Sequence, residues 1–308
     1  MKININILNE FKACEEGKEE FLKHFPNGEA DYQEVLDKCV DLGFLNFAEW
    51  LVLKMPATND TVEVDEIISD GSVFFAGNVK VKNYVSVVGY VCVGGSVDVG
   101  GRIYVEGGIS AGKSINSKGD IISNRFIGAY GSIVSDGLIK AENDVFSGVD
   151  IISKDGIKSR KSITAKRHIK TNGSIYSEFN IDSGANISAM LGIEAEGSIK
   201  SDLRIYAGCN IVSKGKIKAA RDIFANGYIK SLSSIKSSEN IKAGEHIEAS
   251  KHIEAGKHIE AGGHIKAGGH IKAGGHIDAG EHIEAGENFC IFAGVPVSKK
   301  MWYEHGVW

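Results

Sequence analysis

Proline, paired cysteines and long apolar runs are all scarce in this chain of 308 residues. With 3 prolines, few positions interrupt backbone hydrogen bonding. The 5 cysteines include no CxxC pair, which argues against a disulfide scaffold or zinc knuckle and indicates a reducing cytoplasmic environment. No apolar run reaches about 18 residues and no signal-peptide layout opens the chain, so we expect no membrane association.

Motifs that would indicate catalysis are missing as well. No Ser/His/Asp or Cys/His set stands out from the repeat background. The segment Gly94-Gly95-Ser96 starts no helix, so it does not resemble a phosphate-binding loop. We therefore expect a protein that is not an enzyme and that carries no cofactor.

The chain has instead an aliphatic or aromatic residue at every sixth position. The series runs from Ile67 to Val295, which makes (295 − 67)/6 + 1 = 39 positions, all Ile, Val or Phe. A small residue often follows two positions later, and the alternation of a strand turns both residues inward. Glycine then allows the chain to turn. Each hexad is predicted to be one short strand and a corner.

Such strands cannot bury their apolar face alone and must wind into a parallel β-helix. Three hexads per coil predict a mainly β fold, a three-sided solenoid of about 18 residues per coil. That gives 13 coils and a length of roughly 60 Å at ~4.8 Å per strand. A coil of two hexads stays open, because offsets of 12 and 18 give similar charge pairing in residues 230–284.

A small α-helical N-terminal cap is expected before the array. Asn9 can cap a helix over residues 10–25, and further helices are expected near Tyr32–Leu42 and Phe47–Met55. Placed at the open end of the first coil, these helices would cover unpaired backbone groups. Large side chains near the other end are expected to cover it in the same way: Phe289, Ile291, Phe292, Val295, Trp302, Tyr303 and Trp308. The predicted domains are a helical cap (1–66), a solenoid (67–295) and an aromatic tail (296–308).

The repeat Gly-x-Ile-x-Ala-Gly, as in residues 263–268, resembles that of bactofilin-like, polymer-forming β-solenoids. The resemblance covers about residues 67–295 and implies a right-handed, non-enzymatic scaffold that assembles end to end. The helical head and aromatic tail depart from that family and would block such growth. The head segment Ala13–Gly17, followed by Phe21 and Phe25-Pro26, is similar to a module that precedes repeats in bacterial and phage proteins, which implies a phage or mobile-element product.

Left-handed hexapeptide acyltransferases also use six-residue repeats. Their small residue comes four positions after the aliphatic one, whereas here it comes two positions later. The array also lacks the inserted loop that holds an acceptor site in those enzymes. A hexapeptide-type transferase is therefore the less favoured alternative.

Charge is distributed unevenly along the chain. Residues 1–66 have a balance of 6 − 15 = −9, and residues 152–236 have 15 − 7 = +8. Lys200, Lys218 and Lys236 fall 18 apart and predict a like-charge column on one face. A protein is the expected partner, with nucleic acid as the alternative and self-association left open. The other expected contact residues are Arg160, Lys161, Lys166, Arg167, Lys170 and Tyr206.

Histidine precedes the core isoleucine in seven consecutive hexads near the end of the array. With 18 residues per coil, His246, His264 and His282 would stack on one face. Such a ladder could bind zinc or nickel or respond to pH. No fourth ligand has a fixed geometry, so we expect no resident metal, and these three histidines are only weak candidates.

Together these features predict a non-enzymatic binding scaffold that presents columns of side chains to a macromolecular partner. The main alternative is a phage-encoded inhibitor that binds and blocks a host defence complex. A metal-binding protein is a further alternative.

Overall fold

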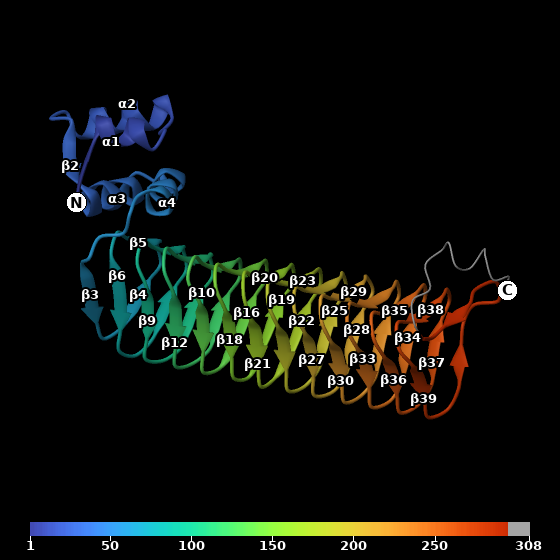
Figure 1. The fold of residues 1–308 in the computed structure, drawn as a ribbon. Helices are drawn as coiled ribbons and strands as arrows, with labels where there is room; N and C mark the ends of the chain where they lie inside the picture. Colours follow the sequence, from blue (N-terminus) through green and yellow to red (C-terminus); the bar gives the residue numbers. More distant parts are fainter. Residues whose placement is uncertain (295–308) are drawn as a thin grey trace. The chain divides into compact units, whose positions relative to one another are not determined.

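A computed structural model describes residues 1–294 and shows a parallel β-solenoid preceded by four short helices (Figure 1). Three parallel sheets of 13 strands each form the solenoid. Every third strand belongs to the same sheet, and the register Ile103↔Ile121 shows a coil of 18 residues. The predicted three-sided coil is confirmed, and the coil of two hexads is excluded.

Each sheet takes one strand from every coil. The first sheet contains β3 (Thr61–Val64), β6 (Asn78–Val81), β9 (Val97–Val99), β12 (Ile115–Ser117), β15 (Ile133–Ser135), β18 (Ile151–Ser153), β21 (Ile169–Thr171), β24 (Ile187–Ala189), β27 (Ile205–Ala207), β30 (Ile223–Ala225), β33 (Ile241–Ala243), β36 (Ile259–Ala261) and β39 (Ile277–Ala279). The second sheet contains β4 (Ile67–Ser69), β7 (Val85–Val87), β10 (Ile103–Val105), β13 (Ile121–Ser123), β16 (Leu138–Ala141), β19 (Gly156–Ser159), β22 (Ser174–Ser177), β25 (Ile193–Ala195), β28 (Ile211–Ser213), β31 (Ile229–Ser231), β34 (Ile247–Ala249), β37 (Ile265–Ala267) and β40 (Ile283–Glu284). The third sheet contains β5 (Val73–Phe75), β8 (Val91–Val93), β11 (Ile109–Ala111), β14 (Ile127–Ala129), β17 (Val145–Ser147), β20 (Ile163–Ala165), β23 (Ile181–Ser183), β26 (Ile199–Ser201), β29 (Ile217–Ala219), β32 (Ile235–Ser237), β35 (Ile253–Ala255), β38 (Ile271–Ala273) and β41 (Ile291–Phe292).

The interior is built from the two inward residues of each strand, as predicted. Isoleucines at the first position, such as Ile121, are fully buried. At the second position, Ser135 Oγ donates to the Gly119 carbonyl at 2.8 Å and accepts from the Gly137 amide at 3.0 Å. The inner serine therefore joins the corner of its own coil to the corner of the preceding coil, which satisfies a buried hydroxyl.

Corner glycines of the repeat are required by close approach between coils. Among residues 1–294, glycine has a positive φ only at Gly28, Gly43, Gly156 and Gly294. At Gly274, a Cβ atom would lie 2.1 Å from the carbonyl oxygen of Gly256 in the coil before it. A side chain there would push the stacked corners apart.

The N-terminal head contains four helices and a two-stranded antiparallel sheet. The strands are β1 (Lys2–Asn4) and β2 (Glu29–Asp31), and the helices are α1 (Ile5–Glu10), α2 (Glu15–His24), α3 (Tyr32–Asp41) and α4 (Leu45–Lys54). The second and third expected helices are confirmed. The helix expected over residues 10–25 is confirmed only over Glu15–His24, where Cys14 and not Asn9 is the N-cap. Its first residues belong instead to the end of α1, which Asn4 caps, and Lys12 at φ 60° separates the two helices.

The head packs on the outer face of the third sheet. The Gln33 side chain of α3 donates to the Phe74 carbonyl and accepts from the Ala76 amide, both at 2.9 Å. Phe74 and Cys92 point away from the solenoid interior, yet they are buried in the head core. We expected the helices at the open end of the first coil, but Val64 there is still 37% exposed. Outward apolar residues on β5 and β8 instead give the helices a lateral surface to cover.

The repeat begins earlier and ends differently than the period of six indicates. Strand β3 begins at Thr61, before Ile67. At the other end, β41 pairs with β38 through Ile271↔Ile291, an offset of 20 residues. The expectation that Phe289 continues the core series is therefore wrong: it is 44% exposed, and its ring packs edge-on against His270.

Ile291 is also largely exposed, so it does not cover the interior as expected. The predicted covering residues Val295, Trp302, Tyr303 and Trp308 lie outside the described residues. No helix in residues 1–294 combines the length and apolar character that a membrane span requires.

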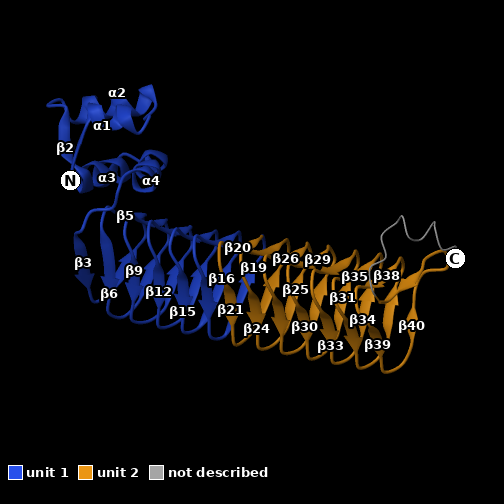
Figure 2. Cartoon of the chain, in the orientation of Figure 1, with its two compact units in different colours: residues 1–161 blue, residues 162–308 orange. Residues whose placement is uncertain are grey.

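The chain divides into two compact units, residues 1–161 and 162–308, which are described separately (Figure 2). The first unit holds the head and the early coils. The second holds the later coils and the predicted lysine and histidine columns.

Candidate functional site

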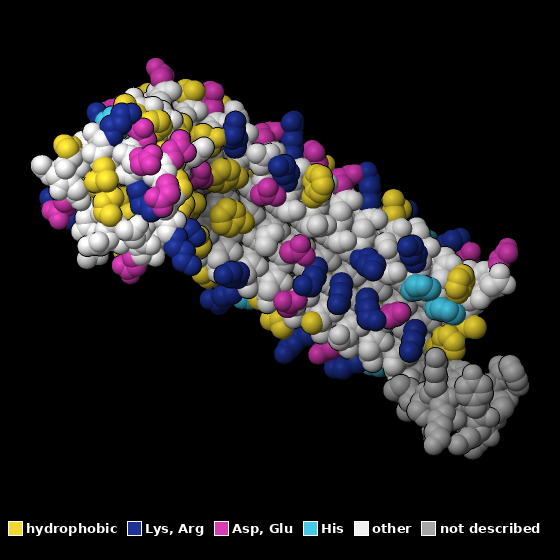
Figure 3. Space-filling view, turned by 90° about the horizontal axis from the view of Figure 1, so that it is seen from above, with side chains coloured by type: hydrophobic (Ala, Val, Ile, Leu, Met, Phe, Trp, Pro, Cys, Tyr) yellow, Lys and Arg dark blue, Asp and Glu magenta, His cyan; other side chains and the backbone are white. Residues whose placement is uncertain are grey.

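The three predicted lysines lie side by side in the second unit. Lys200 in β26, Lys218 in β29 and Lys236 in β32 are in direct register on the outer face of the third sheet, and all three are exposed. Asp182 precedes this column and Glu254 follows it. Basic side chains form a row on the face that Figure 3 shows. The predicted column is confirmed as a structural feature.

The two outer lysines of the column have acidic partners. Lys200 Nζ lies 3.5 Å from Oδ1 of Asp202, and Lys236 Nζ lies 2.6 Å from Oε2 of Glu254. The hydrogen bond from Lys236 lowers the pKa of Glu254, against an opposing effect of partial burial. Lys218 forms no ion pair within the described residues.

Two further cations extend this column sideways, and the sequence interpretation missed them. Lys216 lies just before β29 and Arg221 two residues after it. Both are exposed, and neither forms an ion pair with any residue from 1 to 294. Their position in the sequence could have indicated them, because Lys216, Lys218 and Arg221 lie within six residues. The basic patch is defined here as Lys200, Lys216, Lys218, Arg221 and Lys236.

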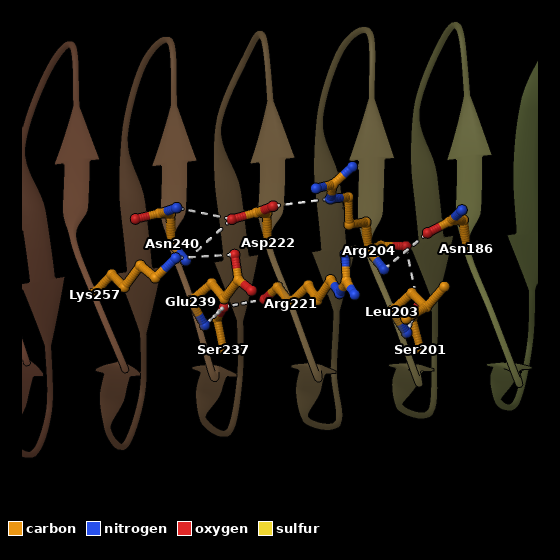
Figure 4. Close-up of polar contacts among 10 residues, drawn as sticks. All are labelled: Asn186, Ser201, Leu203, Arg204, Arg221, Asp222, Ser237, Glu239, Asn240 and Lys257. Carbon is orange, nitrogen blue, oxygen red and sulfur yellow. Dashed lines mark hydrogen bonds and ion pairs between the residues drawn. The ribbon is translucent and has the colours of Figure 1, made fainter.

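A hydrogen-bonded column borders the basic patch at the corner between the third and first sheets (Figure 4). The Arg204 amide donates to Asn186 Oδ1 at 3.1 Å, and its Nε lies 2.9 Å from Asp222 Oδ2. Asn240 Nδ2 also donates to Asp222 at 2.9 Å. Partial burial raises the pKa of Asp222, but the bonds from Asn240 and Arg204 outweigh it and leave that pKa below its ordinary value. Arg204 is thus neutralised within the corner.

Glu239, next to Asn240 in the sequence, also forms an ion pair. Glu239 Oε2 lies 3.4 Å from Lys257 Nζ in the next coil (Figure 4). Arg221 contributes its carbonyl oxygen to a hydrogen bond from Ser237 Oγ, while its guanidinium has no acidic partner in the described part of the chain. The patch therefore retains uncompensated positive charge at Lys216, Lys218 and Arg221.

Two of the predicted contact residues lie on a different face. Lys170 in β21 and Tyr206 in β27 are on the outer face of the first sheet. Tyr206 stacks on Phe224 with ring centroids 5.4 Å apart and an interplanar angle of 1°. Because each hexad turns the chain to the next side of the coil, residues close in sequence are distributed over three faces.

The other predicted basic residues are at corners or in the first unit. Lys166 and Arg167 follow β20, at the corner before β21. Arg160 and Lys161 follow β19 in the first unit, where Arg160 Nε lies 2.7 Å from Glu142 Oε2. The predicted contact residues therefore lie on different faces and corners of the coils.

The predicted histidine column is present in the second unit. The rings of His246 and His264 lie 4.1 Å apart, and those of His264 and His282 lie 5.1 Å apart. Within residues 1–294, the one group that could hold a metal is His246, His264 and Glu281, whose ligand atoms lie within 4.8 Å of one another. The third possible ligand is therefore Glu281 and not His282.

Most of the histidines in this region have a structural role. His252 Nδ1 accepts from the His270 amide at 3.0 Å, and His258 Nδ1 accepts from the His276 amide at 3.2 Å. Asn240 performs the same role for the His258 amide at 3.2 Å. The residue before the core isoleucine therefore provides a hydrogen-bond acceptor for the next coil.

Comparisons of the chain with family models, curated proteins and solved structures find no match. The fold defines the chain as a three-sided parallel β-solenoid with a helical N-terminal head.

Proposed function

We propose that this chain is a non-enzymatic binding scaffold whose basic patch docks an acidic surface of a protein partner. The observation that carries the proposal is the uncompensated charge of Lys216, Lys218 and Arg221. Lys218 is in direct register between Lys200 and Lys236. Neighbouring like charges on a sheet repel, and an acidic partner would relieve that repulsion.

A protein is favoured over nucleic acid because the basic patch contains no aromatic side chain. Single-stranded nucleic acids are commonly bound by cations together with aromatic stacking platforms. The stacked pair Tyr206 and Phe224 lies on the first sheet, whereas the basic patch lies across the third. Successive strands of the third sheet are evenly spaced, so the lysines in register on them are evenly spaced as well. Such a row of cations is complementary to a row of carboxylates on a partner.

The proposal also includes a family and a cellular setting. A three-sided solenoid of hexad repeats supports a bactofilin-like scaffold in the cytoplasm, and the head segment supports a phage origin. In that setting the scaffold would inhibit a host defence complex by direct binding. Transferase and metal-binding functions are less favoured, because the described coils contain no inserted loop and four of the seven repeat histidines accept a backbone hydrogen bond through Nδ1.

The test is a charge reversal of the basic patch. We expect the triple variant Lys216→Glu, Lys218→Glu and Arg221→Glu to bind a fluorescent polyglutamate peptide at least tenfold more weakly in anisotropy titrations at low salt. Binding by the unaltered chain should weaken as salt rises. Equal loss in the matched control, with the same charge change at the exposed residues Lys54, Arg102 and Lys113, would contradict the proposal.

An oligothymidylate titration under the same conditions separates the two partner classes. Weaker binding of the oligonucleotide than of polyglutamate supports a protein partner. Tighter oligonucleotide binding that requires Tyr206 would transfer the function to the first sheet.

A further inference from the structure

The helical head contains an apolar cavity of about 300 Å³. Its walls come from α2 and from the pair α3 and α4, and they include Phe21, Phe25, Phe47 and Trp50. Cys39 lines the same cavity, and burial raises the pKa of its thiol to about 11. The cavity is therefore a weakly polar space, and its volume lies at the lower end of the range for small-molecule sites.

Lys12 lies on the wall of this cavity in a costly backbone conformation. Its φ of 60° makes it the one non-glycine residue with positive φ among residues 1–294. It follows the C-cap of α1, where the Ala13 amide bonds the Leu8 carbonyl at 2.8 Å. Glycine is the usual residue there, because a Cβ atom disfavours the left-handed conformation.

The same head uses glycine at its other left-handed positions. Gly28 and Gly43 have φ values of +72° and +76°. Lysine at the third left-handed position, residue 12, therefore indicates a role for its side chain.

Two lysines on the cavity wall lack acidic partners among the described residues. Lys12 and Lys38 both line the cavity, and neither forms an ion pair within residues 1–294. The lining acid Glu20 is already engaged, because its carboxylate lies 3.1 Å from Lys23 Nζ and 3.3 Å from His24 Nε2. The cavity thus combines an apolar interior with available positive charge.

We propose that the head cavity binds a small amphiphilic anion, with an aliphatic chain in the cavity and a carboxylate at Lys12 and Lys38. A volume of 300 Å³ equals the share of about ten water molecules at ~30 Å³ each, which suits a medium-length chain. The ammonium groups provide the charge-assisted hydrogen bonds that a carboxylate accepts.

The test is a titration of the full chain with decanoate, followed through the fluorescence of Trp50. Phenylalanine replaces Trp302 and Trp308 in all samples, so that Trp50 is the one tryptophan left of the 3. We expect a saturable change, and binding of uncharged decanol at least tenfold weaker than that of decanoate. No saturable change, or equal binding of decanol, would overturn the proposal.

Lys12→Gly separates a binding role from a structural one. Glycine relieves the backbone strain, so the thermal midpoint should rise while decanoate affinity falls about tenfold or more. Lys54→Ala, at the end of α4 and outside the cavity lining, should leave the affinity unchanged. Undiminished decanoate affinity in Lys12→Gly would overturn the proposal.

Gly17→Leu fills the cavity from α2. A Cβ atom at Gly17 would lie 4.0 Å from Phe47 Cε1 and 3.3 Å from the exposed Cys14 Sγ, which can move. Leucine also favours a helix more than glycine does, so the head should stay folded. We expect loss of the saturable signal with an unchanged far-UV circular dichroism spectrum, and persistence of that signal would count against the cavity as the site.

Discussion

The histidines of the later coils should act as hydrogen-bond acceptors that can be exchanged for asparagine but not for alanine. In His252→Ala and His258→Ala, the amides of His270 and His276 lose acceptors at 3.0 and 3.2 Å. Loss of the acceptor should cost about 1 kcal/mol at the part-buried His270 amide and less at the exposed His276 amide, so the double variant should lose about 1–2 kcal/mol. In the Asn variants the loss should be below ~0.5 kcal/mol, because Asn240 already serves the His258 amide in this way.

Urea denaturation provides the free energies, and amide hydrogen exchange provides the location of the effect. Protection should fall at His270 and His276 in the Ala variants, while amides of the early coils keep theirs. His282→Ala is the matched control, because its Nδ1 accepts no backbone amide within residues 1–294. Equal stability of the Ala and Asn variants, or unchanged exchange at the two amides, would refute this reasoning.

Three further outcomes follow from the interior and the ion pairs. Ser135→Ala should cost about 1–2 kcal/mol in urea denaturation, because it removes a part-buried bond to a carbonyl and a buried bond from an amide. Ser135→Thr keeps the hydroxyl and should cost less. Ile247→Ala, at a fully buried site, should cost about 2–5 kcal/mol, and a loss below ~1 kcal/mol would show that the coils collapse around the gap. A hydrogen bond from Lys242 lowers the pKa of Glu260, so the pair stabilises the folded chain while Glu260 is ionised. This stabilisation is fully present above the ordinary pKa of 4.5 and is lost as pH falls below it. That loss should stay below ~1 kcal/mol because the pair is exposed, and Glu260→Gln should abolish it in a pH titration of stability.

Much of the solenoid could be predicted because the pattern that defines each strand lies within six consecutive residues. The alternation of Ile121 with inward Ser123 assigns each hexad to a strand and its inner face, and the structure confirms this assignment over nearly the whole array. The end of the series could not be predicted in this way. Phe289 fits the period, but Ile291 pairs with Ile271 instead, and the ring of Phe289 packs on His270.

The candidate basic patch was predictable only in part. Lys200, Lys218 and Lys236 share one column because a spacing of 18 matches the coil, but this followed only if the coil held three hexads. Arg221 lies at the corner that follows β29, next to this column. Lys170 comes from the same basic region of the sequence but lies on the first sheet. The sequence contains the charges, but the winding of the coil decides which charges become neighbours.

The strand, its inward residues and the repeat of six can be read from the sequence alone, because alternation and corner spacing are properties of a few consecutive residues. The number of hexads per coil follows only from the pairing of the strands, because residues 12 and 18 positions apart are alike in this repeat. The tertiary structure also decided that the head lies on β5 and β8, because Phe74 and Cys92 become a lateral apolar surface only once the coils are stacked.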